Sequence, residues 1–467
     1  MRAQELTTRR DFLKWTSLAA LAGLAAACAP TAAPAPTAEP KKEAAPTAAR
    51  AEVVPTLEPT KAPAAQTGGK VVAWMWGGTP AQIRWEKDQL SDFEKQTGLK
   101  VEYVERDWAK QREDILSALT SGAVPDVGRT HSKYVAEFGD SGDLKALEDF
   151  PDFPKVAETM VPSYLATLEN KGKHYGLVES VYPFILAANQ PMLDKAEVKV
   201  PANWDDFREA VKKLAKPDQG IYGYTIPGGV NLDAAYRWIP WLFKSGGRCL
   251  SKDMTEPTFN SDAGVAALEM LVELQKAKAI PPGNAAYAFA ENADLWGSEK
   301  AAMSTEGPWW QSVLEGQYKW TTEQVKAKLT IAGVPAPATP IGSEPSATLL
   351  DVIMYTMFSK GKNLDGGWLL LKHWEDPERS KQRTSPANSE GLPGVKSVYE
   401  PGVTWEFVGK DAYFKEAESV EIWPNHPKIT EIQMKIAEGL NAAFSGTVKP
   451  KDALDKAAEA AAKLMKE

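Results

Sequence analysis

Cysteine and histidine are scarce in this chain of 467 residues, which contains two cysteines and four histidines. If Cys28, near the N-terminus, carries lipid, Cys249 is left alone, an internal disulfide is excluded and packing must supply the stability. The four histidines are His131, His174, His373 and His426. They are widely separated, and none has a second His or Cys at the spacing of metal ligands. The sequence therefore predicts no metal site.

Catalytic motifs and basic clusters are missing as well. Neither a GxSxG nucleophile elbow nor a phosphate-binding P-loop occurs. The adjacent acids Asp205 and Asp206 follow Trp204 at an expected helix start, where they complement the helix dipole. The formal net charge is −8 and becomes −10 when residues 1–27 are removed, which argues against a nucleic-acid partner. We expect a protein without catalytic residues and without a cofactor.

The N-terminus carries the pattern of an export signal. The motif TRRDFLK at residues 8–14 contains the paired arginines Arg9 and Arg10, and it precedes an apolar run from Leu18 to Ala27. That run is too short to span a membrane, and the arginines indicate a twin-arginine type signal peptide. Cys28 follows three alanines as in a lipobox, although Ala25 stands where leucine is usual. An ordinary cleaved signal with an incidental cysteine is the alternative.

Residues 29–68 are rich in Ala, Pro and Thr, as in the segment APTAAPAPTAEP. Such a composition cannot offset the conformational entropy of the chain, so we expect a disordered tether rather than a domain. A tether behind a lipidated cysteine would hold a folded domain close to a membrane. We therefore expect a protein at the cell surface or in the periplasm, attached only by its lipid to the outer face of the cytoplasmic membrane. About 400 residues remain, enough for two lobes with separate cores.

The folded part opens with alternating strand and helix patterns. Strands are predicted at 70–75 and 100–104, helices at about 82–96 and 110–121, and a third strand after Pro125. This alternation indicates a mostly parallel α/β sheet. Ligands of such sheets lie beyond the carboxyl ends of the strands. The residues found there are Trp76, Gly77, Arg129, Thr130 and His131.

The stretch KAAMSTEGPWWQSVL, residues 300–314, places two tryptophans at the start of a helix. A buried strand is predicted at 301–305, a turn at Glu306 and Gly307, and Pro308 suits the first helical position. Neighbouring helical residues point roughly 100° apart, so Trp309 and Trp310 should not both face one core. One of them is expected to line open space as a stacking surface. Two core aromatics on adjacent faces are the alternative.

A series of segments then resembles one known family. The segments are FEKQTGLKVEY, LTSGAVPDV, GDLKAL, GKHYGLV, VPANWDDFREAVKKL, GSEKAAMSTEGPWW and FSGTVKPKDALDKAA. In their order they resemble the family 1 extracellular solute-binding proteins of ABC importers, which are similar to maltose-binding protein. The resemblance runs from about Gly69 to the C-terminus. It implies a two-lobed periplasmic-binding-protein fold, with crossing hinge segments and a central ligand cleft.

The resemblance also implies an organisation and partners. Lobe one would comprise residues 69–181 and 352–405, and lobe two residues 182–351 and 406–467. A sugar or oligosaccharide would be held between the lobes of a monomer and delivered to the permease of the ABC importer.

The family's GPW motif matches Gly307, Pro308 and Trp309, which makes Trp309 the expected sugar platform and Trp310 its helper. Maltose-binding protein differs from this chain at three places. It has an aromatic residue where Thr130 stands, a carboxylate near Tyr182, and an aromatic residue where this chain has Gln433. These departures argue against a maltodextrin ligand.

The segment from Tyr224 to Gly247 has aromatic residues at near-helical spacing. The family places a ligand-contacting aromatic residue here, and Tyr236 or Trp238 fits. An aromatic core stripe is the alternative, most of all for Trp241. The full set of expected ligand contacts is Trp76, Gly77, Arg129, Thr130, His131, Tyr182, Tyr236, Trp238, Glu306, Trp309 and Trp310.

Two other functions stay open at this point. A secreted glycoside hydrolase would also have an aromatic-rich cleft, but it would need two carboxylates about 5 to 10 Å apart across it. A structural surface lipoprotein would explain the leader and the tether, but not aromatic residues at strand ends. The identity and length of the sugar also stay open, as does a polyol or a phosphorylated glycerol in its place.

Overall fold

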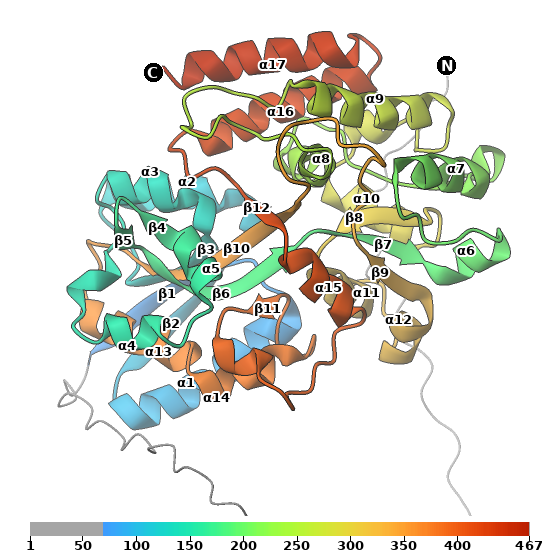
Figure 1. Cartoon of the computed structure of the whole chain (residues 1–467). Coiled ribbons are helices and arrows are strands. Elements are labelled where there is room, and N and C mark those ends of the chain that lie inside the picture. The colour runs from blue at the N-terminus through green and yellow to red at the C-terminus, as the bar shows by residue number, and fades with distance from the viewer. Residues whose placement is uncertain (1–68, 467) are drawn as a thin grey trace, which may run out of the picture. The chain divides into compact units, whose positions relative to one another are not determined.

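The first three strands form the parallel βαβ arrangement that the sequence predicts. In the computed structural model, which describes residues 69–466, β1 pairs in parallel with β2 on one side and β3 on the other (Figure 1). The elements are β1 (Lys70–Trp76), α1 (Pro80–Thr97), β2 (Lys100–Arg106), α2 (Gln111–Ser121) and β3 (Val127–His131). The expected export signal, Cys28 and the tether lie outside the described residues. Within residues 69–466 no helix is long and apolar enough to cross a membrane.

Local signals set the ends of α1. The Thr79 side chain accepts a hydrogen bond from the Gln82 N–H, and Pro80 occupies the first turn, where its missing N–H costs nothing. Gly98 ends the helix in the left-handed conformation, with φ +72°. The chain therefore reverses at both ends of α1 as the sequence indicates.

The large sheet is mixed rather than mostly parallel. Its seven strands follow the order β11-β6-β10-β3-β1-β2, and β12 also pairs with β10. The added strands are β6 (Gly176–Pro183), β10 (Thr348–Met357), β11 (Leu392–Pro393) and β12 (Val420–Ile422). β10 runs antiparallel to both β3 and β6, and every residue of β6 and β10 is buried. Four strands from later in the chain thus complete the sheet.

A second sheet has three antiparallel strands, in the order β8-β7-β9. They are β7 (Ile185–Asn189), β8 (Met303–Glu306) and β9 (Leu329–Ala332). Alternate residues of β7 point to opposite faces, so Ile185 and Ala187 join one hydrophobic cluster while Leu186 and Ala188 join the other. Both faces of this sheet are therefore covered.

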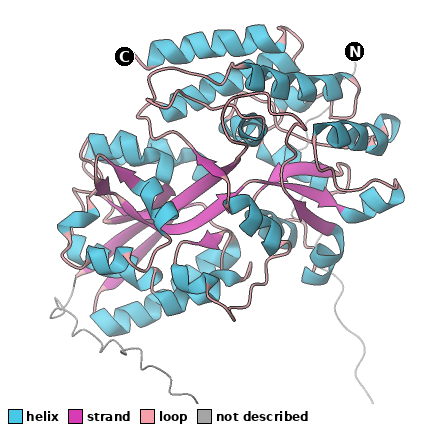
Figure 2. Cartoon of the chain, viewed as in Figure 1, coloured by secondary structure: helices cyan, strands magenta, loops and turns pink. Residues whose placement is uncertain are grey.

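Helices flank both sheets (Figure 2). Those of residues 135–165 and 364–417 are α3 (Val135–Asp140), α4 (Phe153–Ala157), α5 (Pro162–Leu165), α13 (Leu364–Trp374), α14 (Pro377–Ser380) and α15 (Lys410–Ala417). Those between, with the last two of the chain, are α6 (Gln190–Lys195), α7 (Trp204–Leu214), α8 (Leu232–Lys244), α9 (Asp262–Lys276), α10 (Phe289–Gly297), α11 (Trp309–Gly316), α12 (Thr322–Lys328), α16 (Ile429–Phe444) and α17 (Pro450–Leu464). A two-stranded ribbon is formed by β4 (Glu169–Asn170) and β5 (Lys173–His174).

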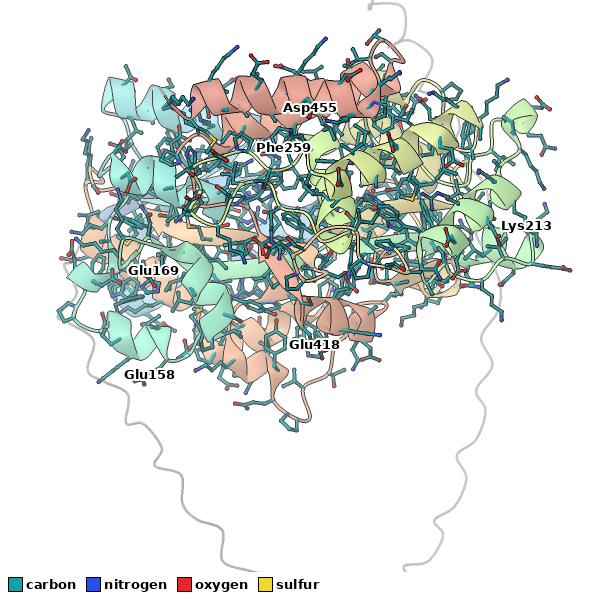
Figure 3. All side chains as sticks on the ribbon, turned by 45° about the horizontal axis from the view of Figure 1, so that its top comes forward. Glu158, Glu169, Lys213, Phe259, Glu418 and Asp455 are labelled. Atoms are coloured by element: carbon teal, nitrogen blue, oxygen red, sulfur yellow. The ribbon has the colours of Figure 1, made fainter. Side chains whose placement is uncertain are left out.

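The C-terminal helices pack onto the helices of the second sheet. α16 lies against α8, α9 and α17. In Figure 3, Phe259 lies next to Asp455 of α17, and the neighbouring Asn260 Nδ2 donates to Asp455 Oδ1 at 2.8 Å.

We call β1–β3, β6, β10 and β11 with their helices the first lobe, and β7–β9, α6–α12, α16 and α17 the second lobe. Phe184 alone separates β6 of the first lobe from β7 of the second.

Candidate ligand-binding site

The two adjacent tryptophans diverge as their helical spacing predicts. Trp310 is fully buried, with its ring centroid 5.4 Å from that of Trp296, whereas Trp309 is only partly buried. The turn differs slightly from the prediction, because Glu306 is the last residue of β8 and Trp309 the first of α11. Gly307 is required here, since a Cβ at this position would lie 2.1 Å from the Trp309 ring.

Trp309 contacts the segment that connects the two sheets. Its ring centroid lies 5.6 Å from that of Tyr182, at the end of β6, and 5.3 Å from that of Phe184. Trp309 also packs against both hydrophobic clusters. A flat ring in this place presents an apolar surface where the lobes meet, the kind of surface on which the C–H face of a sugar stacks.

A buried ion pair lies beside Trp309. Arg237 Nη2 of α8 donates to Glu306 Oε2 at 3.0 Å, and Asn292 Nδ2 donates to Glu306 Oε1 at 3.0 Å. Burial raises the pKa of Glu306, and the charge of Arg237 opposes this shift. The Arg237 guanidinium also lies 5.3 Å from the Trp309 ring centroid. Glu306 thus holds Arg237 in place over Trp309, and both charges are paired within the protein.

His131, at the end of β3, contacts the second lobe. Its Nε2 lies 2.9 Å from the Tyr236 hydroxyl of α8. On its other side Nδ1 is 3.2 Å from Asp351 Oδ1, but the two atoms are not aligned for a hydrogen bond. Burial lowers the pKa of His131, and Asp351 opposes this shift. A neutral imidazole therefore spans from Asp351 to Tyr236.

Lys133 was not singled out from the sequence, although it lies in the same loop after β3. It is 3% exposed, and its Nζ donates to Gln433 Oε1 of α16 at 3.2 Å. The ammonium also lies 5.2 Å from the Tyr236 ring centroid. Burial lowers the pKa of Lys133 to about 8, against the opposing effect of Asp351. The rule that ligands lie beyond strand ends would have found Lys133 if it had been applied two residues further along.

Arg129 and Trp76 are held within the first lobe. Arg129 is 2% exposed; its Nη1 donates to the Trp76 carbonyl at 2.9 Å, and its Nη2 to Gln82 Oε1 at 3.2 Å. The guanidinium also forms ion pairs with Glu179 at 3.7 Å and Glu390 at 3.8 Å. The fully buried Trp76 donates its indole N–H to Asp114. These side chains are occupied by contacts that support the loops of the site.

The remaining expected contacts are distributed between core and loop. Trp238 and Thr130 are buried, and Trp241 is a core residue whose ring centroid lies 4.6 Å from that of Phe207. Gly77 has φ +73°, which suits glycine in the loop after β1.

Two open surface hollows, of about 600 and 390 Å³, lie away from these residues, at the turn between α16 and α17 and beside α1. Both hollows are shallow and lined mainly by exposed residues, and neither contains an expected ligand contact.

Aromatic and polar side chains from two α/β lobes that meet at crossing strands define a periplasmic binding protein. Residues 88–415 match the family described as bacterial extracellular solute-binding protein, and the chain belongs to this family. The expected recognition and the two-lobed fold are thereby confirmed. The family and its relatives are binding proteins rather than enzymes, and they give no support to a glycoside hydrolase.

Two relatives and one solved structure cover most of the chain. A galactooligosaccharide-binding protein of Bacillus subtilis is 23% identical over 413 residues, which are 86% of this chain and 91% of the relative. A probable amino-acid ABC transporter periplasmic-binding protein of Sinorhizobium fredii is 27% identical over 359 residues, 71% of this chain and 77% of the relative. The GacH receptor of Streptomyces glaucescens, solved with acarbose, superposes with a TM-score of 0.74 at 22% identity, covering 86% of this chain and 100% of the receptor.

Proposed function

We propose that this protein captures a sugar or oligosaccharide between its two lobes and delivers it to the membrane permease of an ABC importer, without chemistry of its own. The observation that carries this proposal is Trp309, a partly exposed ring at the crossing segment, flanked by Tyr182 and by Arg237. Arg237 is already paired with Glu306, so it is not free to bind a charged ligand. A sugar ligand is also supported by two similar proteins, the galactooligosaccharide-binding relative and the receptor solved with acarbose.

Within this proposal the side chains take different parts. Trp309 stacks on the sugar, and polar groups from both lobes exchange hydrogen bonds with its hydroxyls; these are His131, Lys133, Tyr182, Tyr236 and Asp351. Gln433 is fully buried and positions Lys133 by accepting its hydrogen bond. Buried residues support the site from behind; these are Trp76, Arg129, Thr130, Trp238, Glu306 and Trp310. Gly77 shapes the loop after β1. The proposed lobe boundaries are 181/182 within β6, 351/352 within β10 and 405/406 in the loop before α15, so the ends of β6 and β10 that were counted with the first lobe cross toward the second. The protein acts as a monomer.

A ligand panel tests the proposed function. A ligand at one hundred times its Kd stabilises the native state by about 2.7 kcal/mol, which a thermal-shift assay detects. The panel holds galactooligosaccharides, maltose, acarbose and tagatose, the polyol mannitol and the twenty amino acids, and we expect at least one of the sugars to raise the Tm of the purified protein. If only an amino acid stabilises the protein, the proposal of a sugar ligand is wrong.

Export and anchoring form a separate proposal that rests on the N-terminal sequence. We propose a twin-arginine signal and a lipidated Cys28 that keeps the protein at the outer face of the cytoplasmic membrane. Cys28→Ser should release a soluble protein, measured by fractionating cells, because the acyl chains have no attachment point. Arg9→Lys with Arg10→Lys should block export altogether. A Cys28→Ser protein that still fractionates with membranes would contradict the anchor, and export of the double variant would indicate the general secretory route.

A further inference from the structure

Trp108 is a large aromatic side chain at the carboxyl end of β2 that the sequence did not single out. It is 39% exposed and opens a short 3-10 turn, residues 108–110. The turn is fixed by Asp107, whose Oδ1 accepts a hydrogen bond from the Ala109 N–H at 3.0 Å. Trp108 therefore lies at the edge where the strands of the first lobe end, on a backbone that is already ordered.

Two neighbours cover part of the Trp108 ring. A Cβ at Gly77 would stand 2.8 Å from the indole, so the loop after β1 packs directly against it. On another side the His131 ring lies 4.8 Å away, centroid to centroid. The rest of the ring stays open to solvent. Because these contacts already restrict the Trp108 side chain, it loses little conformational entropy when a ligand stacks on its open part.

Trp108 belongs to a line of rings that leads to Trp309. From Trp108 the line passes to His131 at 4.8 Å, to Tyr236 at 5.7 Å, to Phe184 at 6.1 Å and to Trp309 at 5.3 Å, each distance joining ring centroids. The line crosses from the first lobe to the second at His131 and Tyr236. The two partly exposed tryptophans thus stand at opposite ends of one row of packed rings, of which the three inner rings are buried.

Two polar atoms along this line face only each other. His131 Nδ1 and Asp351 Oδ1 lie 3.2 Å apart without the alignment of a hydrogen bond, and within residues 69–466 neither atom has another partner. The two residues are 3% and 7% exposed. A hydroxyl group of a ligand can donate to Asp351 and accept from His131. The chemistry next to the Trp108 ring is therefore that of a polyhydroxylated ligand.

We propose that Trp108 forms an outer subsite which stacks on a second or third sugar unit, so that the protein prefers an oligosaccharide to a monosaccharide. This inference rests on the proposed sugar-binding function. Trp309 holds one sugar ring at the crossing segment, and Trp108 holds another at the far end of the line of rings. His131, Asp351 and Lys133 bind the hydroxyls between the two.

Calorimetric titration of the purified protein with galactose, β-1,4-galactobiose and β-1,4-galactotriose, and with glucose, maltose and maltotriose, tests this inference. In the series that binds, Trp108→Ala should weaken the trisaccharide at least tenfold and change the monosaccharide less than twofold. Trp108→Phe should keep most of the trisaccharide affinity, since it retains a ring. Trp405→Ala is the matched control. That partly exposed tryptophan packs on Tyr399 and Phe414, and its loss should affect both ligand lengths equally little.

The possible failures can be told apart. An equal loss for the monosaccharide and the trisaccharide, or no loss for either, overturns the outer subsite while the sugar-binding function stands. If the wild-type protein binds no member of either series, the outer subsite and the proposed function both fail for these sugars. A thermal melt of each variant verifies that the changes in affinity belong to folded protein.

Discussion

Replacing Trp309 by alanine should weaken sugar binding by at least ~2 kcal/mol, or roughly thirtyfold in Kd, the loss found for buried aromatic anchors at other interfaces. A micromolar ligand has about −8 kcal/mol in total, and a neutral hydrogen bond contributes a net ~0.5 to 1.5 kcal/mol. One ring that stacks on a sugar face therefore outweighs two or three hydroxyl contacts. Isothermal titration calorimetry with the sugar found in the panel measures this loss.

Lobe closure should weaken together with affinity in Trp309→Ala. Trp309 packs against both hydrophobic clusters and against Tyr182 at the crossing segment. A ligand shifts the population of closed protein only through contacts that it makes better in the closed form. Small-angle X-ray scattering with saturating sugar should therefore show a smaller compaction for the variant than for the wild type.

Two buried tryptophans serve as controls for this experiment. Trp310→Ala and Trp241→Ala remove fully buried side chains and should each lower the free energy of unfolding by ~3 to 5 kcal/mol. The affinity of the protein that remains folded should change little. If Trp309→Ala loses less affinity than Trp241→Ala, with both variants folded by circular dichroism, the platform has been placed on the wrong aromatic residue.

The second large effect is expected from Arg237→Ala, which leaves Glu306 as a buried carboxylate without its cationic partner. Breaking a buried ion pair in this way costs about 3 to 5 kcal/mol of stability. Burial already raises the pKa of Glu306 in the folded protein, and loss of Arg237 removes the charge that opposes this shift. A raised pKa in the folded state means that stability is retained at acid pH and is lost as pH rises through that pKa.

Arg237→Ala should therefore be destabilised less at pH 5 than at pH 8, as measured by urea unfolding at both values. Adding Glu306→Gln to Arg237→Ala should recover part of the loss at pH 8, because the buried charge is gone. Arg208→Ala is the matched control, since Arg208 pairs with Asp205 and Glu273 at the surface and should change stability by no more than ~1 kcal/mol. A loss for Arg237→Ala that is equal at both pH values would contradict the account of Glu306.

The sequence predicted the first three strands and the two helices between them, because their signals are local. Apolar runs, the Thr79 cap and Gly98 lie within a few residues of the ends that they set. The mixed sheet could not be predicted in the same way. β10 pairs with β3 and β6 through contacts between residues far apart in the chain, and no local pattern states that pairing.

The sequence by itself determined the family, through a series of segments in order, and the divergence of Trp309 from Trp310, through helical spacing. Tertiary structure alone decided which side chains converge on the site. Trp76, Arg129 and Trp238 are buried in packed interior, while Lys133 and Trp108, which were not expected, lie at the proposed site. Side chains of a strand alternate between two faces and those of a helix turn by about 100° per residue, so local sequence gives only their relative directions, and the long-range packing of the lobes determines which direction faces a ligand.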